Sequence, residues 1–362
     1  MKPSRPAVLS LAAALLAATN LVFGLGGGLA RLGTLPAAAA GPTGASAIAL
    51  HGAVMVCGFF GTLIALERAV ALHRGFAVPL LAGAGGVAGF VFGEPAIAGV
   101  AWLAAGLGFV ALYVHAGLTR AWSLHLVVEG LGALCLALGS AAWLAGLRDA
   151  SIMGWAAFLV LTIAGERREL TQMVRLPAWA RRAFVAVVVL LLAALAVSWV
   201  DAAGRAALLP WWTGCAALAL WLLRFDLAPR AWREPGWRGH TAQALSVGYA
   251  WLLAAALAGL AEQRLDGVAL HFLLLGFVFG MVFGHAPIIL PALARIRPEY
   301  HALARWPLWI MAASLVLRAA GLWGGPSGAL ALAGAGHALA IAWFAAVMAR
   351  GAWRGRVAQS RA

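Results

Sequence analysis

Charge is scarce in this sequence. Only 10% of its 362 residues are Asp, Glu, Lys or Arg, whereas 64% are hydrophobic, and the mean hydropathy is +0.93. A water-soluble domain of this length needs far more charge on its surface, so the composition excludes a soluble globular protein. No hydrophilic stretch is long enough to form a separate domain. We therefore expect one membrane domain over residues 1–362.

Cysteine is equally scarce, and the motifs of several enzyme classes are missing. Cys57, Cys135 and Cys215 all fall inside apolar runs, where thiols act as small packing residues and imply no disulfide framework. The chain has no CxxCH sequence, which excludes haem attached covalently through that motif. It also lacks a nucleophile elbow, a zinc-type CxxC and a phosphate-binding loop. Hydrolase and nucleotide triphosphatase functions therefore have no support.

Apolar runs of about 20 residues are what the sequence has in abundance. They predict an all-α, polytopic membrane protein with about twelve spans in one bundle. The expected spans lie near 7–30, 46–68, 76–94, 96–117, 121–146, 151–170, 182–200, 205–226, 241–262, 267–291, 306–324 and 327–349. Six of the 17 tryptophans lie close to span ends, where indoles anchor a helix at the headgroups: Trp179, Trp211, Trp212, Trp232, Trp237 and Trp306.

The basic residues fall in the short loops and predict the topology. The net charge is +14, from 26 Lys and Arg against 12 Asp and Glu. With a cytoplasmic N-terminus, 21 of the 26 lie inside and 5 outside, which favours an even number of spans and two cytoplasmic termini. This distribution indicates membrane topology and a lipid environment, and we expect no nucleic-acid partner.

Two histidines near the start of different spans suggest chemistry. His51 opens the pattern His51-Gly52-x-x-Met55-x-x-Gly58-Phe59, and His271 lies at nearly the same expected depth in the tenth span. A histidine in hydrocarbon is costly without a partner, so two at matching depth predict a shared ligand, and a haem iron held by both is the ligand we expect. The alternative is that each bonds a backbone carbonyl or interfacial water.

Helical periodicity gives the neighbours of these histidines. It places Met55 and Gly58 on the side of His51, where the glycine leaves either a gap for a flat macrocycle or the site of a close helix crossing. Gly276, Gly280 and Gly284 form a small-residue stripe on the tenth span, opposite His271, that predicts a closely packed neighbouring helix. Arg318 is expected in the outer half of its span, as a haem propionate partner or an arginine that snorkels to the interface.

A second polar group is expected toward the cytoplasmic side, as a second metal site or part of a proton path. It consists of His115, His125, Glu129, Glu67, Glu166, Glu169 and His285. Glu129 is one turn after His125, and His285 precedes Pro287, which leaves a backbone carbonyl without its usual donor. The alternative is that these residues form interfacial ion pairs within Glu67-Arg68 and within Glu166-Arg167-Arg168-Glu169, and that the histidines simply lie at helix ends.

Four segments of the chain carry a resemblance to a known family. These are the pattern around His51, Gly248-Tyr249-Ala250-Trp251, Leu270-His271 and Gly284-His285. In type and order they resemble the NnrS family. That family comprises bacterial membrane proteins with twelve spans, haem and copper, associated with nitric oxide metabolism and nitrosative stress. The resemblance implies non-covalent haem b, copper, a bacterial inner-membrane location and nitric oxide or a redox partner as the interacting species. The chain departs from the family at Ala53-Val54, where the family has a histidine and a glutamate.

A more distant likeness is to subunit I of haem-copper oxidases, whose low-spin haem ligands lie on the second and tenth spans. Spans 151–170 and 182–200 contain no histidine here, so the copper ligands of an oxidase centre are missing. We therefore expect a haem protein of nitric oxide handling or haem- or copper-linked electron transfer. The alternative is a secondary transporter that uses buried His and Glu for proton or substrate coupling. Paired broken helices would favour transport, and the sequence suggests one break, at Pro287 and Pro291.

Overall fold

The computed structural model describes residues 5–36, 44–173, 175–201, 205–294 and 297–361. That part of the chain contains helices and turns and no β-strand, which confirms the all-α prediction. Within it, eleven helices are long and apolar enough to cross a membrane. All three cysteines are buried and unpaired, as expected. The chain forms two compact units, residues 1–170 with 192–207 and residues 171–191 with 208–362, and each is described by itself.

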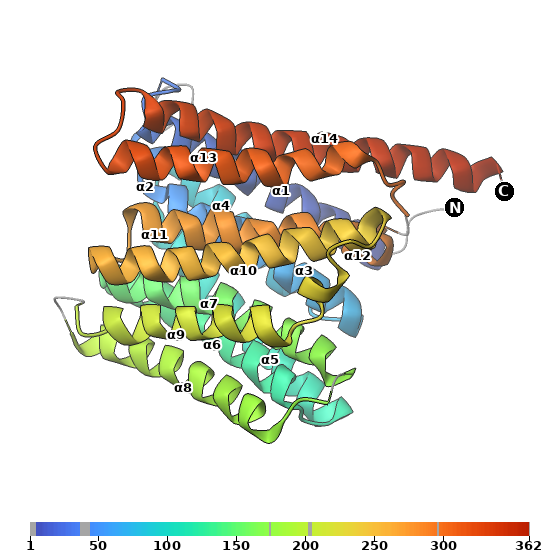
Figure 1. Ribbon diagram of the computed structural model, residues 1–362, viewed down its shortest axis with the longest axis horizontal. Coiled ribbons are helices and arrows are strands. Elements are labelled where there is room, and N and C mark those ends of the chain that lie inside the picture. Colours follow the sequence, from blue (N-terminus) through green and yellow to red (C-terminus); the bar gives the residue numbers. More distant parts are fainter. Residues whose placement is uncertain (1–4, 37–43, 174, 202–204, 295–296, 362) are drawn as a thin grey trace. The chain divides into compact units, whose positions relative to one another are not determined.

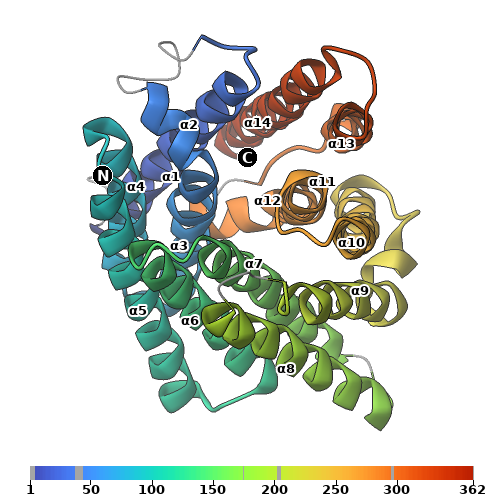
Figure 2. The ribbon, with the colours of Figure 1, turned by 90° about the vertical axis from the view of Figure 1, so that its left-hand side faces the viewer.

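The first unit contains the first seven helices and the end of α8. Its elements are α1 (Arg5–Arg31), α2 (Gly44–Ala53), η2 (Val54–Phe60), α3 (Gly61–Leu72), α4 (Ala77–Phe92), α5 (Pro95–Arg120), α6 (Leu124–Leu144), α7 (Arg148–Leu170) and the last part of α8 (Ala178–Val200). The three elements from α2 to α3 form one continuous span. In Figure 2, which looks along the helices, α5, α6 and α7 lie side by side.

The third expected span, 76–94, is shorter in the structure. It forms α4, a helix of 16 residues, between Gly75 and Gly93, which both adopt positive φ angles (80° and 69°). At 1.5 Å per residue this helix is roughly 24 Å long, less than the hydrocarbon core of about 30 Å. The described residues thus contain eleven helices long and apolar enough to cross a membrane, and the third of the twelve expected spans is a shorter apolar helix.

Glycines set the helix packing in the first unit. α6 and α7 approach closely where Gly139 lies against Gly154 and where Gly132 faces Thr162. A Cβ atom at Gly165 of α7 would collide with the side chain of Glu129 on α6. These contacts place two polar side chains, Glu129 of α6 and Thr162 of α7, inside the bundle, each against a glycine of the neighbouring helix.

The second unit contains the first part of α8 and the remaining helices. Its further elements are η3 (Thr171–Met173), α9 (Leu208–Phe225), η4 (Ala228–Ala231), α10 (Gly236–Glu262), α11 (Gly267–His271), η5 (Phe272–Val278), α12 (Phe279–Ala294), η6 (Ala302–Arg305), α13 (Trp306–Leu322) and α14 (Ala329–Arg361). α13 and α14 form an antiparallel pair, the orange and red ribbons of Figure 1.

The small-residue stripe of the tenth span packs against α10, as predicted. Gly276 lies against Trp251, and Gly280 lies against Gly248. The predicted break at Pro287 is absent, because α12 continues through it to Ala294.

Two spans contain a seven-residue π-helical segment, one in each unit. In η2 the N–H of Gly61 bonds the carbonyl of Val56, and at the end of η5 the N–H of Phe279 bonds that of Leu274. Both are i to i−5 bonds. Such segments are rare in proteins and are frequent at functional sites.

Candidate functional site

His51 lies near the end of α2, and α1 fixes its ring. Its Nδ1 is 2.6 Å from the carbonyl oxygen of Gly24, and the side chain is half-buried. A Cβ atom at Gly28 would lie 2.7 Å from Cε1 of the imidazole, so glycine at this position makes room for the ring. A carbonyl oxygen only accepts hydrogen bonds, so Nδ1 carries the proton in this contact and Nε2 carries the lone pair.

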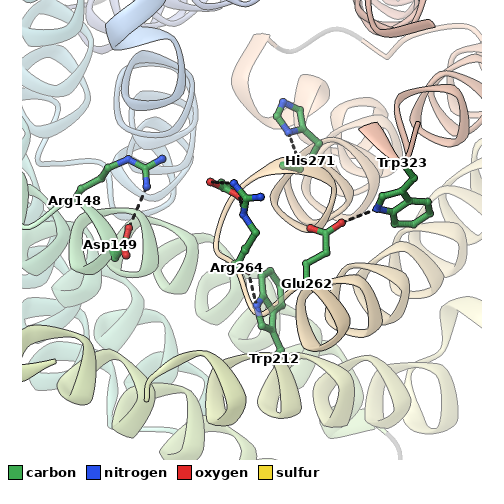
Figure 3. Close-up of polar contacts among 9 residues, drawn as sticks. Arg148, Asp149, Trp212, Glu262, Arg264, His271 and Trp323 are labelled. Carbon is green, nitrogen blue, oxygen red and sulfur yellow. Dashed lines mark hydrogen bonds and ion pairs between the residues drawn. The ribbon is translucent and has the colours of Figure 1, made fainter. Parts of the chain in front are cut away.

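His271 is the last residue of α11 and has the same arrangement. Its Nδ1 is 2.8 Å from the carbonyl oxygen of Gly267, one turn earlier (Figure 3). The ring is half-buried. The turn before this helix is held by Arg264, whose Nε lies 3.0 Å from the carboxylate of Asp266. Because Nδ1 of His271 donates to the carbonyl of Gly267, its Nε2 is the nitrogen with the lone pair, as in His51.

The two histidines share a local geometry. Each is followed by a π-helical segment, three residues later for His51 and directly for His271. Each bonds a backbone carbonyl through Nδ1, the bond named in the alternative interpretation of the sequence. The same bond is the outer-shell contact that orients a metal-ligating histidine, because it fixes the tautomer that presents Nε2 to the metal. The contact is compatible with both interpretations.

Met55 and Gly58 also face α1. A Cβ atom at Gly24 would collide with the sulfur of Met55, and one at Gly58 would collide with the side chain of Asn20. Asn20 is fully buried and donates a 2.9 Å hydrogen bond from Nδ2 to the carbonyl of Gly83 on α4. The space beside Gly58 is thus filled by α1, as in a close helix crossing.

Arg318 lies on α13, about one turn before the end of the helix, and is half-buried. It interacts electrostatically with His337 of α14, a buried histidine that the sequence analysis did not consider. Nδ1 of His337 is 2.7 Å from Oγ of Ser314, which itself bonds the carbonyl of Met311. The serine hydroxyl therefore donates to the carbonyl and accepts from the imidazole.

The second polar group forms a cluster in the first unit. Arg68 of α3 donates a hydrogen bond to Oε2 of Glu129 on α6 and forms an ion pair with it. The carboxylate of Glu129 is fully buried. The guanidinium also lies over the ring of Tyr113 on α5, with Cζ 4.9 Å from its centroid. The ion pair expected within Glu67-Arg68 is therefore replaced by a pair between two helices, 61 positions apart in the chain.

Three further acidic residues complete this cluster. Glu67 and Glu166 are half-buried, and Glu166 interacts electrostatically with both Glu67 and Glu129. Glu169, with 53% of its side chain exposed, lies with Oε1 3.8 Å from Nε2 of His125. The structure thus brings His125 and four glutamates of the predicted group together.

The other two histidines of that group lie elsewhere. Nε2 of His115 accepts a 2.8 Å hydrogen bond from Arg74, in the turn after α3. His285 is half-buried in α12 of the second unit. Within the described residues, no group of three or more His, Cys, Asp or Glu has the geometry of a metal site.

His240 is a buried histidine that sequence reasoning missed. Its Nε2 lies 2.9 Å from the carbonyl oxygen of Phe283, the group left without its helical donor by Pro287. Thr241 donates to the next carbonyl, that of Gly284, at 2.8 Å. Pro287 was the signal available in the sequence. It predicts that a carbonyl one turn earlier lacks its helical donor, but it does not indicate that His240 supplies the hydrogen bond.

Residues 9–353 match the family described as a domain of unknown function, DUF8744. The chain belongs to the DUF8744 family. The matched region of this DUF8744 protein contains His51, His271 and the Arg68–Glu129 cluster. No curated protein and no solved structure matches the chain.

Proposed function

We propose that this protein binds a non-covalent haem in the membrane through His51 and His271. The observation that carries the proposal is their shared local geometry. Each imidazole bonds a backbone carbonyl through Nδ1, at 2.6 and 2.8 Å, and each precedes a π-helical segment, by three residues for His51 and directly for His271. Two neutral imidazoles that present Nε2 are the ligand set of a six-coordinate, low-spin haem.

Within this proposal other residues have supporting roles. Arg318 supplies a cation for a propionate, and the residues around Gly24 and Gly28 hold the His51 ring in one orientation. Haem supplies one-electron chemistry when bound. The residues named here fix the ligand nitrogens and the local charge.

The resemblance to the NnrS family supports a more specific role. We propose that the protein acts in nitric oxide or nitrosative-stress handling, or in electron transfer linked to haem or copper, in a bacterial inner membrane. Twelve spans with both termini in the cytoplasm belong to this proposal, with α4 as the short third span. The residues Ala53-Val54 stand where the family pattern has a histidine and a glutamate, so these two positions supply no copper ligand.

Haem binding is tested by loading the detergent-purified protein with haem and measuring its optical spectrum and haem content. We expect one low-spin haem per chain, and we expect His51→Ala and His271→Ala each to lose the low-spin signal. His73→Asn is the matched control, because His73 lies in a turn with φ 53°, a conformation that asparagine also adopts. A colourless wild-type protein, or a low-spin spectrum in both alanine variants, contradicts the proposal.

A secondary transporter is the second candidate function. The observation that favours it is that each unit contains one irregular span, with η2 in the first and η5 in the second. Transporters build their binding sites at interrupted helices of two repeats. A haem-free protein that moves protons or solutes across proteoliposomes would support this function over the first.

A further inference from the structure

The buried charged cluster of the first unit lies at one end of its helices. α3, α5 and α7 finish at this end, and α6 begins there. Glu67, Arg68, Tyr113, Glu129 and Glu166 all lie within about two helical turns of the end. These residues are inside the membrane-spanning segments, where ionised groups are rare and generally functional.

One carboxylate oxygen at the centre of the cluster, Oε1 of Glu129, lacks a close hydrogen bond among the described residues. Glu129 uses Oε2 for Arg68, whereas its Oε1 is buried. The hydroxyl of Tyr113 is likewise buried and interacts with the carboxylate of Glu129 and the guanidinium of Arg68. The side chains of Glu129 and Tyr113 are at most 1% exposed. A buried carboxylate oxygen without a close donor is unfavourable in its charged form, so this arrangement favours a species that neutralises the carboxylate.

The charges of the cluster identify that species. Glu67, Glu129 and Glu166 carry three negative charges when ionised, against Arg68 and the buried Arg167. One negative charge is therefore in excess. A single proton neutralises this charge and turns a carboxylate oxygen into a donor. A metal cation fits less well, because a guanidinium already occupies the carboxylate of Glu129.

A path leads from this centre to water. Glu169 is half exposed, and its Oε1 lies 3.8 Å from Nε2 of His125, whose own side chain is 17% exposed. His125 precedes Glu129 by four positions on α6, so the two side chains lie on one helix face. The hydroxyl of Ser123 lies 3.0 Å from Nδ1 of His125 and limits the movement of the ring.

We propose that Glu129 and Glu166, together with Glu67, form a proton-binding site that exchanges with water through Glu169 and His125. A hydronium ion in the aqueous phase gives up one proton: its O–H bond breaks, an O–H bond forms on a carboxylate oxygen of the cluster, and a water molecule is left. The charged and titratable groups that face the site are Glu67 and Arg68 of α3, Tyr113 of α5, His125 of α6, and Glu166, Arg167, Arg168 and Glu169 of α7. The neighbouring α4 carries no ionisable side chain.

Infrared spectroscopy of the full-length protein in lipid tests this proposal. At neutral pH we expect the C=O band of one protonated carboxylic acid, with the small downshift in D₂O that such a group shows. Glu129→Gln or Glu166→Gln should lose that band, since the amide keeps the shape but cannot take part in the shared protonation. Glu94→Gln, which changes an exposed glutamate at the start of α5, should keep it. Thermal unfolding checks that each variant is folded.

Two further measurements separate the alternatives. His125→Gln should keep the band but slow its exchange in D₂O, which supports the path. Absence of the band in the folded wild-type protein at neutral pH overturns the proposal, as does its persistence in both glutamine variants. Loss of the band on adding NaCl at constant pH also overturns it, because the site would then bind sodium. The infrared band does not require haem, so this proposal and the haem proposal can fail separately.

Discussion

Nδ1 of His51 lies 2.6 Å from the carbonyl oxygen of Gly24, which belongs to a helix 27 positions earlier in the chain. The orientation of the proposed ligand is thus set by α1 and not by its own helix. In His271 the corresponding bond is local, to Gly267 one turn before. A change in α1 should therefore affect His51 alone.

Gly28→Ala is expected to disturb haem binding. The new Cβ would lie 2.7 Å from Cε1 of His51, so the ring must move, and we expect a partial or complete loss of the low-spin optical spectrum. Gly52→Ala is the matched control, because a Cβ there meets no atom within 4 Å. Alanine favours a helix over glycine by about 1 kcal/mol at either site, so helix propensity cannot explain a loss. Equal spectra of both variants would refute this role of α1.

His271→Gly with added imidazole is expected to recover the low-spin spectrum that the variant alone loses. The free ring can occupy the vacated space and supply the missing nitrogen ligand. Absorbance is measured during titration with imidazole, and His115→Gly is treated in the same way as the control, because His115 bonds Arg74 and has no proposed role at the haem. If imidazole leaves the spectrum of His271→Gly unchanged while the wild type binds haem, His271 is not a ligand.

Arg68→Met is expected to destabilise the first unit strongly. It leaves the fully buried carboxylate of Glu129 without its partner, a change that costs roughly 3–5 kcal/mol. The double variant with Glu129→Met should recover most of this loss, because the carboxylate that lost its partner is then removed as well. Arg148→Ala removes an exposed pair with Asp149 (Figure 3) and should cost about 1 kcal/mol or less. The free energy of unfolding of each variant is measured in a denaturant series. Equal losses for Arg68→Met and Arg148→Ala would contradict the prediction.

The proposed topology is tested with single introduced cysteines. The native Cys57, Cys135 and Cys215 are buried, so a new surface thiol is the one that reacts. In intact spheroplasts an impermeant reagent should label Thr34→Cys and leave Arg175→Cys unlabelled until the membrane is opened. Both positions are exposed in the structure. The reverse pattern would show that the arginine bias was misread.

Hydropathy predicted the positions of the helices well, because a span needs about 20 apolar residues and few other segments can supply them. It overestimated the third span, whose length is limited by the positive φ of Gly75 and Gly93. It also assigned Trp211 and Trp212 to the interface. Both are fully buried, and Nε1 of Trp212 bonds the carbonyl of Arg264.

The candidate site was harder to predict because its contacts are distant in the sequence. Nothing near Arg68 indicated that its partner would be Glu129, or that Asn20 would fill the space at Gly58. The π-helical segments have no signal in composition, since they differ from their neighbours by one hydrogen-bond register. Only the free carbonyl created by Pro287 could be deduced locally.

Electron paramagnetic resonance of the oxidised, haem-loaded protein tests the central claim most directly. Two imidazole ligands give a strong axial field, so we predict a low-spin ferric signal in the wild type that disappears in both His51→Ala and His271→Ala. Haem that is absent from the wild type, or a high-spin ferric signal at full occupancy, would contradict the account of His51 and His271 as paired haem ligands.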